Sequence, residues 1–206
     1  MPHEPSRGSS AAAVRDFFTP RAAEWDRRFP DDGPAYAAAV ADLGLRPGDA
    51  VLDAGCGTGR ALPTLRAAVG PEGTVLGVDL TPAMLDAALR EGRDGFAGLA
   101  LADVARLPLR DGCLDAVFAA GLISHLSDPR ENLRELARVV RPGGRLALFH
   151  PVGRAALAAR HGRALTPDDL RAEPQLRPLL ADAGWRLDSY TDEDTRFLAL
   201  AGREVG

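Results

Sequence analysis

The chain has 206 residues, of which 46% are hydrophobic and 26% are charged, values typical of one soluble globular domain with a substantial core. No run approaches the roughly 18 to 20 apolar residues of a membrane span, and residues 1–10 carry no apolar signal core. The net charge of −4 argues against a nucleic-acid partner. We therefore expect a cytoplasmic protein without membrane attachment, with Cys56 and Cys113 as reduced thiols.

The N-terminal part predicts a tail followed by a helical cap. Residues 1–13 are rich in Ser, Ala and Pro and predict a disordered tail. Residues 14–45 predict the cap, an aromatic-rich helix and a second helix over 35–43, separated by the prolines of residues 30–34. Residues 46–206 complete a single Rossmann-like domain.

Apolar strands then alternate with helices. The predicted strands are 50–54, 74–80, 99–103, 114–120 and 145–150, and the predicted helices are 60–69, 82–90 and 129–140. This alternation predicts a doubly wound, mostly parallel sheet. The end of the chain differs, since a helix over 176–183 precedes two strands, 186–190 and 196–201, that predict an antiparallel hairpin.

A glycine-rich loop follows the first strand. The strand ends at Asp53, and Gly55, Gly57 and Gly59 stand at alternate positions after it. Glycine lets a ligand approach the backbone closely, and the amides of the following helix N-terminus favour an electron-rich or anionic group. The loop alone predicts a nucleotide-like ligand and no reaction.

Acidic residues at the next strand ends narrow the ligand. Asp79 ends the second strand, where a carboxylate accepts hydrogen bonds from ribose hydroxyls and repels a phosphate. Asp103 ends the third strand, where an acidic side chain beside a backbone amide suits the adenine edge. Ligands of such sheets bind at the carboxyl ends of the strands. These positions predict an adenosine site without a phosphate clamp.

Four segments resemble the class I S-adenosylmethionine-dependent methyltransferases of the small-molecule, methyltransferase-11-like type. They are VLDAGCGTG at 51–59, VLGVDLTPAMLDAA at 75–88, LADVARLPLRDGCLDAVFAA at 101–120 and LRELARVVRPGGRLAL at 133–148. A dinucleotide-binding dehydrogenase would have G-x-G-x-x-G, whereas this loop has G-x-G-x-G. The resemblance implies a seven-stranded sheet of order 3-2-1-4-5-7-6 with an antiparallel last strand and helices on both faces.

For the methionine end of S-adenosylmethionine, the resemblance implies that Gly55, Gly57 and Gly59 pass beneath the cofactor. Asp53 would support the amino group, directly or through water, although bracing the loop is an alternative role. Cys56 is interpreted as a small residue that fills the loop and not as a nucleophile.

For the adenosine end, the resemblance implies that Asp79 holds the ribose hydroxyls and Leu80 packs on the adenine. Asp103 and Val104 would read the adenine edge, and the Ala120 carbonyl would face the methionine tail. No metal site is predicted.

Two histidines near strand ends are candidate general bases. His125 lies just past the fourth strand and His150 ends the fifth, so both should face the ligand. Bracing the loop that leads into the next helix is the alternative for His125. Methyl transfer from a sulfonium needs mainly positioning and suitable electrostatics, so a base is not obligatory.

The acceptor pocket should be formed by segments outside the four motifs. Trp25 and Phe29 of the cap are the candidate pocket residues, and a plain amphipathic helix is the alternative reading of that segment. Residues 151–170, with several basic side chains, are a second candidate lid or a solvated helical face. We expect a small-molecule methyl acceptor as the partner, and a monomer or homodimer.

Two other functions remain as alternatives. One is a cofactor-binding or partner subunit without catalysis, against which the intact motifs count. The other is a nucleic-acid or protein methyltransferase. A nucleic-acid enzyme would have an Asn/Asp-Pro-Pro-aromatic motif after the fourth strand, where this chain has Gly121-Leu122-Ile123-Ser124.

Overall fold

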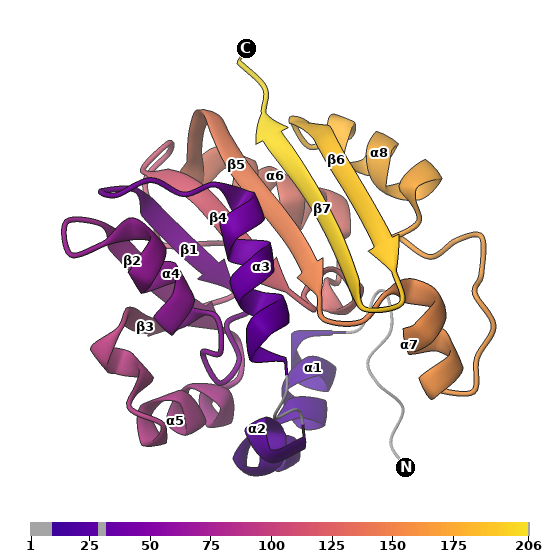
Figure 1. Cartoon of the computed structure of the whole chain (residues 1–206), viewed down its shortest axis with the longest axis horizontal. Helices are drawn as coiled ribbons and strands as arrows, with labels where there is room; N and C mark the ends of the chain where they lie inside the picture. Colours follow the sequence, from indigo (N-terminus) through magenta and orange to yellow (C-terminus); the bar gives the residue numbers. More distant parts are fainter. Residues whose placement is uncertain (1–9, 29–31, 206) are drawn as a thin grey trace.

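The computed structural model describes residues 10–28 and 32–205, which form one seven-stranded sheet flanked by helices (Figure 1). The strands are β1 Ala50–Ala54, β2 Thr74–Asp79, β3 Gly98–Leu101, β4 Leu114–Ala120, β5 Val140–His150, β6 Trp185–Glu193 and β7 Arg196–Arg203. The longer helices are α1 Ala11–Phe18, α3 Gly33–Leu43, α4 Leu62–Val69, α5 Pro82–Arg90, α6 Pro129–Val139, α7 Arg154–Arg160 and α8 Glu173–Asp182. Shorter helical segments are η1 Thr19–Glu24, α2 Trp25–Arg28, η2 Arg93–Gly95 and η3 Ile123–His125.

The strand order is β3-β2-β1-β4-β5-β7-β6, which confirms the predicted fold. β1 to β5 pair in parallel, and β7 runs antiparallel to both of its neighbours, β5 and β6. In Figure 1 the arrowheads of β1, β5 and β6 therefore point toward α1 and α2, whereas that of β7 points away. The carboxyl ends of the parallel strands meet at the edge covered by the N-terminal segment.

Two apolar clusters hold the helices on the two faces of the sheet. Side chains of α6 and α8, such as Leu133, Leu136 and Leu176, pack on one face together with Trp185. Side chains of α3 and α4, such as Leu43 and Leu65, pack on the other face. Burial of these apolar side chains is the main stabilising contribution to such a layered core.

The N-terminal helix begins earlier than predicted. Residues 11–13, which we placed in the disordered tail, form the first turn of α1. Alanine has the highest helix propensity, and the Ser10 side chain caps the helix by accepting a hydrogen bond from the Ala13 N–H at 3.2 Å. Composition suggested a tail, but the three alanines continue a capped helix.

The segment Arg141–Gly144, which lies between the predicted helix 129–140 and the predicted strand 145–150, is part of β5. Leu114 pairs with Val140 and Ala116 pairs with Arg145, so the intervening residues bulge from the ladder. Gly143 has a φ of 74°, a conformation that favours glycine. The Arg141 Nε donates to Asp115 Oδ1 at 2.6 Å and ties the bulge to β4. The Pro-Gly-Gly sequence therefore forms a bulge inside β5.

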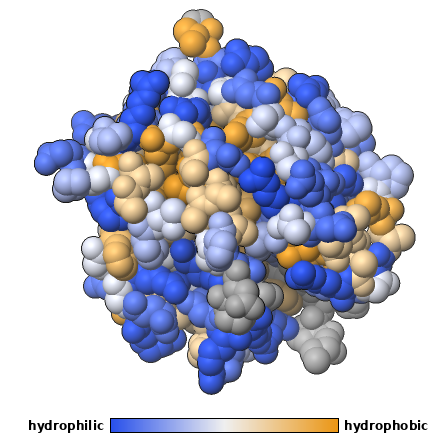
Figure 2. All heavy atoms as spheres, in the orientation of Figure 1, coloured by the Kyte–Doolittle hydropathy of each residue, from blue (hydrophilic) through white to orange (hydrophobic). Residues whose placement is uncertain are grey.

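Figure 2 shows hydrophilic and hydrophobic residues interspersed on the visible face. Within residues 10–28 and 32–205, no helix is both long enough and apolar enough to span a membrane. The same ranges contain no cluster of three potential metal-binding side chains.

Candidate active site

A cavity of about 620 Å³ lies at the carboxyl ends of the parallel strands. The N-terminal segment, the glycine loop and the turns after β2, β3, β4 and β5 line it, and α7 with the residues after it forms the remaining wall. All described residues predicted for the site line this cavity except Gly59. The predicted pocket residue Phe29 lies outside the described residues.

Two glycines of the glycine loop, Gly55 and Gly57, line the cavity, and only Gly57 has open space beside its Cα. The φ angles are 67° at Gly55, 55° at Gly57 and 79° at Gly59. A Cβ added to Gly57 would meet nothing within 4 Å, whereas one added to Gly59 would lie 2.7 Å from Leu62 Cδ1. Gly59 is buried and does not line the cavity. Leu62 of α4 occupies the space beside its Cα, and the predicted place of Gly59 beneath the methionine portion stays a prediction.

This difference predicts that substitution by alanine affects mainly ligand binding at Gly57 and mainly fold stability at Gly59. Gly57→Ala should weaken S-adenosylhomocysteine binding at least about tenfold, because its methyl group would project into ligand space, with a backbone strain of about 1–2 kcal/mol. Gly59→Ala should destabilise the fold more, because the methyl group would also displace Leu62, and should affect binding less. Calorimetric titration and denaturant unfolding of both variants check this, and the reverse order of effects would contradict it.

Two carboxylates face the cavity from adjacent strands, the buried Asp53 from β1 and the partly buried Asp79 from β2. Asp53 is 2% exposed. Burial, with a smaller contribution from the Asp79 charge, raises the pKa of Asp53 to about 8. Burial also raises the pKa of Asp79, against the opposing effect of hydrogen bonds from the Thr81 and Gly57 amides. The two carboxylates are therefore suited to bind a cationic group that itself moves from water into the cavity.

Asp79 also organises the glycine loop. Its Oδ2 accepts from the Gly57 N–H at 2.9 Å and its Oδ1 from the Thr81 N–H at 2.7 Å. The Cys56 N–H donates to the Val78 carbonyl at 2.8 Å, so loop and β2 are joined at two points. A Cβ at Gly77 would lie 3.1 Å from Cys56 Sγ, and burial raises the pKa of the Cys56 thiol. These contacts agree with a packing role for Cys56 and give no support to a nucleophile.

The residues predicted for the adenosine end also line the cavity. Leu80 and Asp103 are partly buried in the turns after β2 and β3, and Val104 is buried beside Asp103. Asp103 Oδ1 accepts from the Ala105 N–H at 2.8 Å, which fixes the turn that carries both residues. Ala120 ends β4 and is followed by Gly121, where an added Cβ would meet nothing within 4 Å.

Both candidate histidines line the cavity in different surroundings. His150 Nδ1 lies 2.8 Å from the Val152 carbonyl and 3.0 Å from the Val152 amide nitrogen, so the backbone orients this ring in either tautomer. The His125 ring meets Phe18 edge-on, with centroids 5.1 Å apart. His125 is therefore in contact with the N-terminal segment, which the sequence did not predict.

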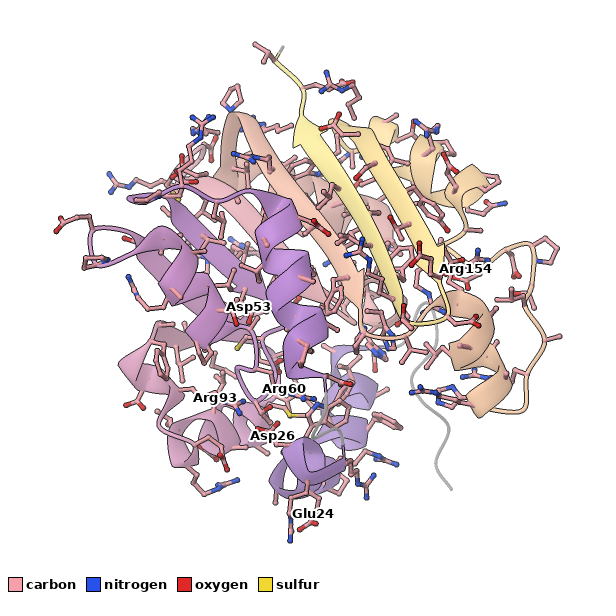
Figure 3. The ribbon with its side chains drawn as sticks, viewed as in Figure 1. Glu24, Asp26, Asp53, Arg60, Arg93 and Arg154 are labelled. Carbon is pink, nitrogen blue, oxygen red and sulfur yellow. The ribbon has the colours of Figure 1, made fainter. Side chains whose placement is uncertain are left out.

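The cap covers the glycine loop through polar contacts as well as aromatic ones. Phe18 packs against Trp25 with centroids 5.5 Å apart, and both line the cavity. Asp26 accepts from Thr58 Oγ1 at 2.6 Å and pairs with Arg93 Nη2 at 2.6 Å, and Arg93 also donates to the Thr58 carbonyl at 2.6 Å. Figure 3 shows Asp26, Arg60 and Arg93 gathered at this end of the molecule. Thr58, Asp26 and Arg93 were missed by sequence reasoning, because no local pattern joins residues 32 to 67 positions apart.

The segment after β5 is tied to the hairpin. Arg154 pairs with Asp169 at 3.1 Å and with Asp192 at 3.2 Å, and its amide donates to Asp192 Oδ1 at 2.8 Å. Arg160, His161 and Arg163 then line the outer part of the cavity. The basic residues of the second candidate lid therefore divide into one that anchors the segment and others that face the cavity.

Comparison with known proteins decides the family. The family model for a methyltransferase domain matches residues 52–148. The ubiquinone/menaquinone biosynthesis C-methyltransferase UbiE of Ectopseudomonas mendocina is 30% identical over 186 residues, covering 76% of this chain and 73% of that protein. This chain belongs to the class I S-adenosylmethionine-dependent methyltransferases. The predicted family is thereby confirmed.

Other methyltransferases show the same likeness. The 27-O-demethylrifamycin SV methyltransferase of Amycolatopsis mediterranei is 37% identical over 110 residues, covering 52% of this chain and 40% of that protein. The crystal structure of an S-adenosylmethionine-dependent methyltransferase from Aquifex aeolicus has a TM-score of 0.67 at 25% identity, covering 95% of this chain and 99% of that one. The chain spans between 36% and 55% of the length of the first five curated relatives.

The cavity fits the methyl donor of this family. S-adenosylmethionine carries a sulfonium and an ammonium group, whose positive charges the carboxylates of Asp53 and Asp79 complement. Gly57 and Gly121 leave open space where side chains would otherwise stand. The acidic turn at Asp103 offers an acceptor next to backbone amides for the adenine edge.

Proposed function

We propose that the protein transfers a methyl group from S-adenosylmethionine to a small, largely apolar or aromatic acceptor. The observation that carries the proposal is the convergence of the Asp53–Asp79 pair, the open Gly57 position and an aromatic wall in one cavity. Phe18, Trp25 and Leu122 supply apolar surface on the acceptor side. Rifamycin and quinone methyltransferases among the relatives support an organic acceptor of low molecular mass.

The residues of this chain would bind and orient the two reactants. Asp53 would hold the ammonium group, Asp79 the ribose hydroxyls, Asp103 with Val104 the adenine edge, and Leu80 the adenine face. When bound, S-adenosylmethionine would supply a methyl group on a cationic sulfur. The acceptor would form its bond to the methyl carbon in line with the carbon–sulfur bond, which breaks and leaves its electrons on sulfur. Positioning and exclusion of water by the cap then provide most of the rate increase.

The aromatic cap would close the acceptor side. The Asp26, Thr58 and Arg93 contacts hold the cap on the same loop that borders the methionine end. Acceptor binding beneath Phe18 and Trp25 would therefore take place beside the cofactor and not on a separate surface. This juxtaposition is what in-line transfer requires.

Of the two histidines, His150 is the better candidate for a general base. Its ring lines the cavity and is oriented by the contacts of Nδ1 with the Val152 backbone, so it is held in a defined position toward a substrate. We expect His150→Gln to lower turnover about 10²- to 10⁴-fold with an O–H or N–H acceptor, with S-adenosylhomocysteine affinity unchanged. His125→Gln is the matched variant, and its effect should be smaller because the His125 ring packs on Phe18. Unchanged turnover of both variants from pH 6 to 9 would rule out a histidine base.

Label transfer tests the proposed reaction. The full chain is incubated with methyl-labelled S-adenosylmethionine and, in parallel, with small-molecule, protein and RNA fractions of a cell extract. We expect label in the small-molecule fraction, and much less label with the Asp79→Asn control at a limiting concentration of S-adenosylmethionine. Label confined to protein or RNA would contradict the acceptor class, and binding without label in any fraction would favour the alternative of a cofactor-binding subunit.

A further inference from the structure

The cavity has a basic outer wall at the end away from the proposed adenosine site. Asp79 ends β2 and Asp103 follows β3, near one edge of the sheet, whereas α7 follows β5 and packs against β6 at the other edge (Figure 1). Arg160 ends α7, His161 and Arg163 come directly after it, and all three are exposed and line the cavity. These three residues, the basic rim, have no part in the proposed binding of the cofactor.

The basic rim presents hydrogen-bond donors. Arg163 Nη2 lies 2.7 Å from His161 Nδ1. A guanidinium can only donate, so Nδ1 is the acceptor and the neutral His161 ring carries its proton on Nε2. Within residues 10–28 and 32–205, no carboxylate oxygen lies within 4 Å of the Arg160 guanidinium nitrogens. The charge of Arg160 is therefore available to an anionic group that enters the cavity.

The acidic residues of the same wall offset only part of its positive charge. Asp169 pairs with Arg154 at 3.1 Å and with Arg171 at 3.3 Å, and it also accepts from the Arg171 amide at 2.9 Å. Asp168 lines the cavity beside it. The two carboxylates leave a small positive excess on the wall. Such an excess favours a monoanion such as a carboxylate, whereas a phosphate dianion requires more positive charge to offset its own.

Apolar side chains share this wall with the basic rim. Leu157 and Arg160 are three residues apart in α7 and therefore lie on the same face of the helix. Leu157 and Leu165 both line the cavity, and Leu165 is 44% exposed. An apolar ligand body that covers these leucines would remove their surface from water. Its charged end would reach the rim and stay partly solvated, which keeps the cost of desolvating it small.

On the basis of the proposed function, we propose that the methyl acceptor is an organic acid whose carboxylate binds to the basic rim. A planar guanidinium matches a carboxylate with two parallel N–H donors, and Arg160 and Arg163 each provide one guanidinium. The atom that receives the methyl group then belongs to the other end of the acceptor, beside the ends of β1 and β4. The carboxylate is not itself methylated, so the product keeps its negative charge.

The charge of the labelled product tests this assignment. The full chain is incubated with methyl-labelled S-adenosylmethionine and the small-molecule fraction of a cell extract, and the products are applied to an anion exchanger at pH 7 and at about pH 2.5. A carboxylic acid ionises near pH 4, so we expect most label above a protein-free control to be retained at pH 7 and released at about pH 2.5. Retention at both pH values would indicate a phosphate or sulfate ester, and label that is not retained at pH 7 would indicate an acceptor without an acid group. Either result would overturn the proposal.

Removal of the two guanidinium groups tests the residues. At limiting amounts of extract, Arg160→Gln combined with Arg163→Gln should label the acid about 5- to 30-fold less, the effect of two charge-assisted contacts that solvent weakens. At saturating amounts the labelling should approach the wild-type level, because the rim holds acceptor and transition state alike. Affinity for S-adenosylhomocysteine should be unchanged, which also shows that the variant is folded. Arg90→Gln combined with Arg177→Gln, which removes the same charge from exposed positions outside the cavity, should keep wild-type labelling.

The remaining outcomes separate this proposal from the proposed function. Undiminished labelling by the rim variant, or a loss that persists at saturating extract, would overturn the binding role of the rim. Label in neutral small molecules would leave the proposed function in place and contradict the acid acceptor. Absence of label from every small molecule with the wild-type protein would contradict the proposed function itself.

Discussion

Replacing Asp53 by asparagine is expected to stabilise the free protein at neutral pH and to weaken its binding of the cofactor. The folded protein keeps Asp53 protonated up to a pKa of about 8, whereas an unfolded chain releases this proton near the ordinary value of 3.8. Between these values the unfolded state gains a solvated carboxylate, so the free energy of unfolding contributed by Asp53 falls as pH rises. Asparagine has no such proton to release.

The advantage of Asp53→Asn should therefore be near zero below pH 4, grow as pH rises, and level off above pH 8. At pH 7 it is on the order of 4 kcal/mol, because each pH unit between the two pKa values contributes about 1.4 kcal/mol. Urea unfolding at several pH values measures it, with the exposed Asp86→Asn as the control. A pH-independent difference between Asp53→Asn and wild type would show that Asp53 is not held protonated.

Asp79→Asn is expected to have the largest effect on cofactor binding. An amide oxygen can accept from Gly57 or from Thr81 but not from both as the carboxylate does, and it carries no charge for the ribose hydroxyls. We expect S-adenosylhomocysteine affinity to fall about 10- to 150-fold, the range for hydrogen bonds to a charged group. Amide chemical shifts of the glycine loop should change in the absence of ligand as well.

Binding of adenosine alone tests the role of Asp79 toward the ribose separately from its role in the glycine loop. Binding of adenosine should weaken in Asp79→Asn as much as binding of the whole cofactor product, because the ribose lies in the shared part. Asp103→Asn serves as the matched variant, since it removes an acid from the neighbouring turn and leaves the Gly57 contact in place. An affinity of Asp79→Asn within twofold of wild type would contradict the assigned role.

The central sheet could be predicted because its determinants are local. Buried strands such as residues 50–54 are apolar runs, and alternation with helices fixes parallel pairing and a right-handed connection. The cavity position followed from the same rule, because residues that end adjacent parallel strands share one edge of the sheet. Asp53, Asp79 and Asp103 could therefore be placed together without coordinates.

The cap contacts and the orientation of single residues could not be predicted in this way. Asp26 meets Thr58 and Arg93 only after the chain has folded, and nothing near Asp26 in the sequence indicates either partner. Gly59 shares the spacing of Gly57, but the packing of Leu62 and Arg93 decides which glycine opens to the ligand. Cytoplasmic location, the oligomeric state and the division at residue 45 stay predictions.

Titration of S-adenosylhomocysteine into the full chain at pH 7, in two buffers with different ionisation enthalpies, tests the account most directly. We predict one site per chain, and release of a proton on binding, because the ammonium group of the ligand stabilises the Asp53 carboxylate that the free protein keeps protonated. Absence of saturable binding would contradict the assignment of the cavity. Binding without proton release would contradict the role of Asp53 in it.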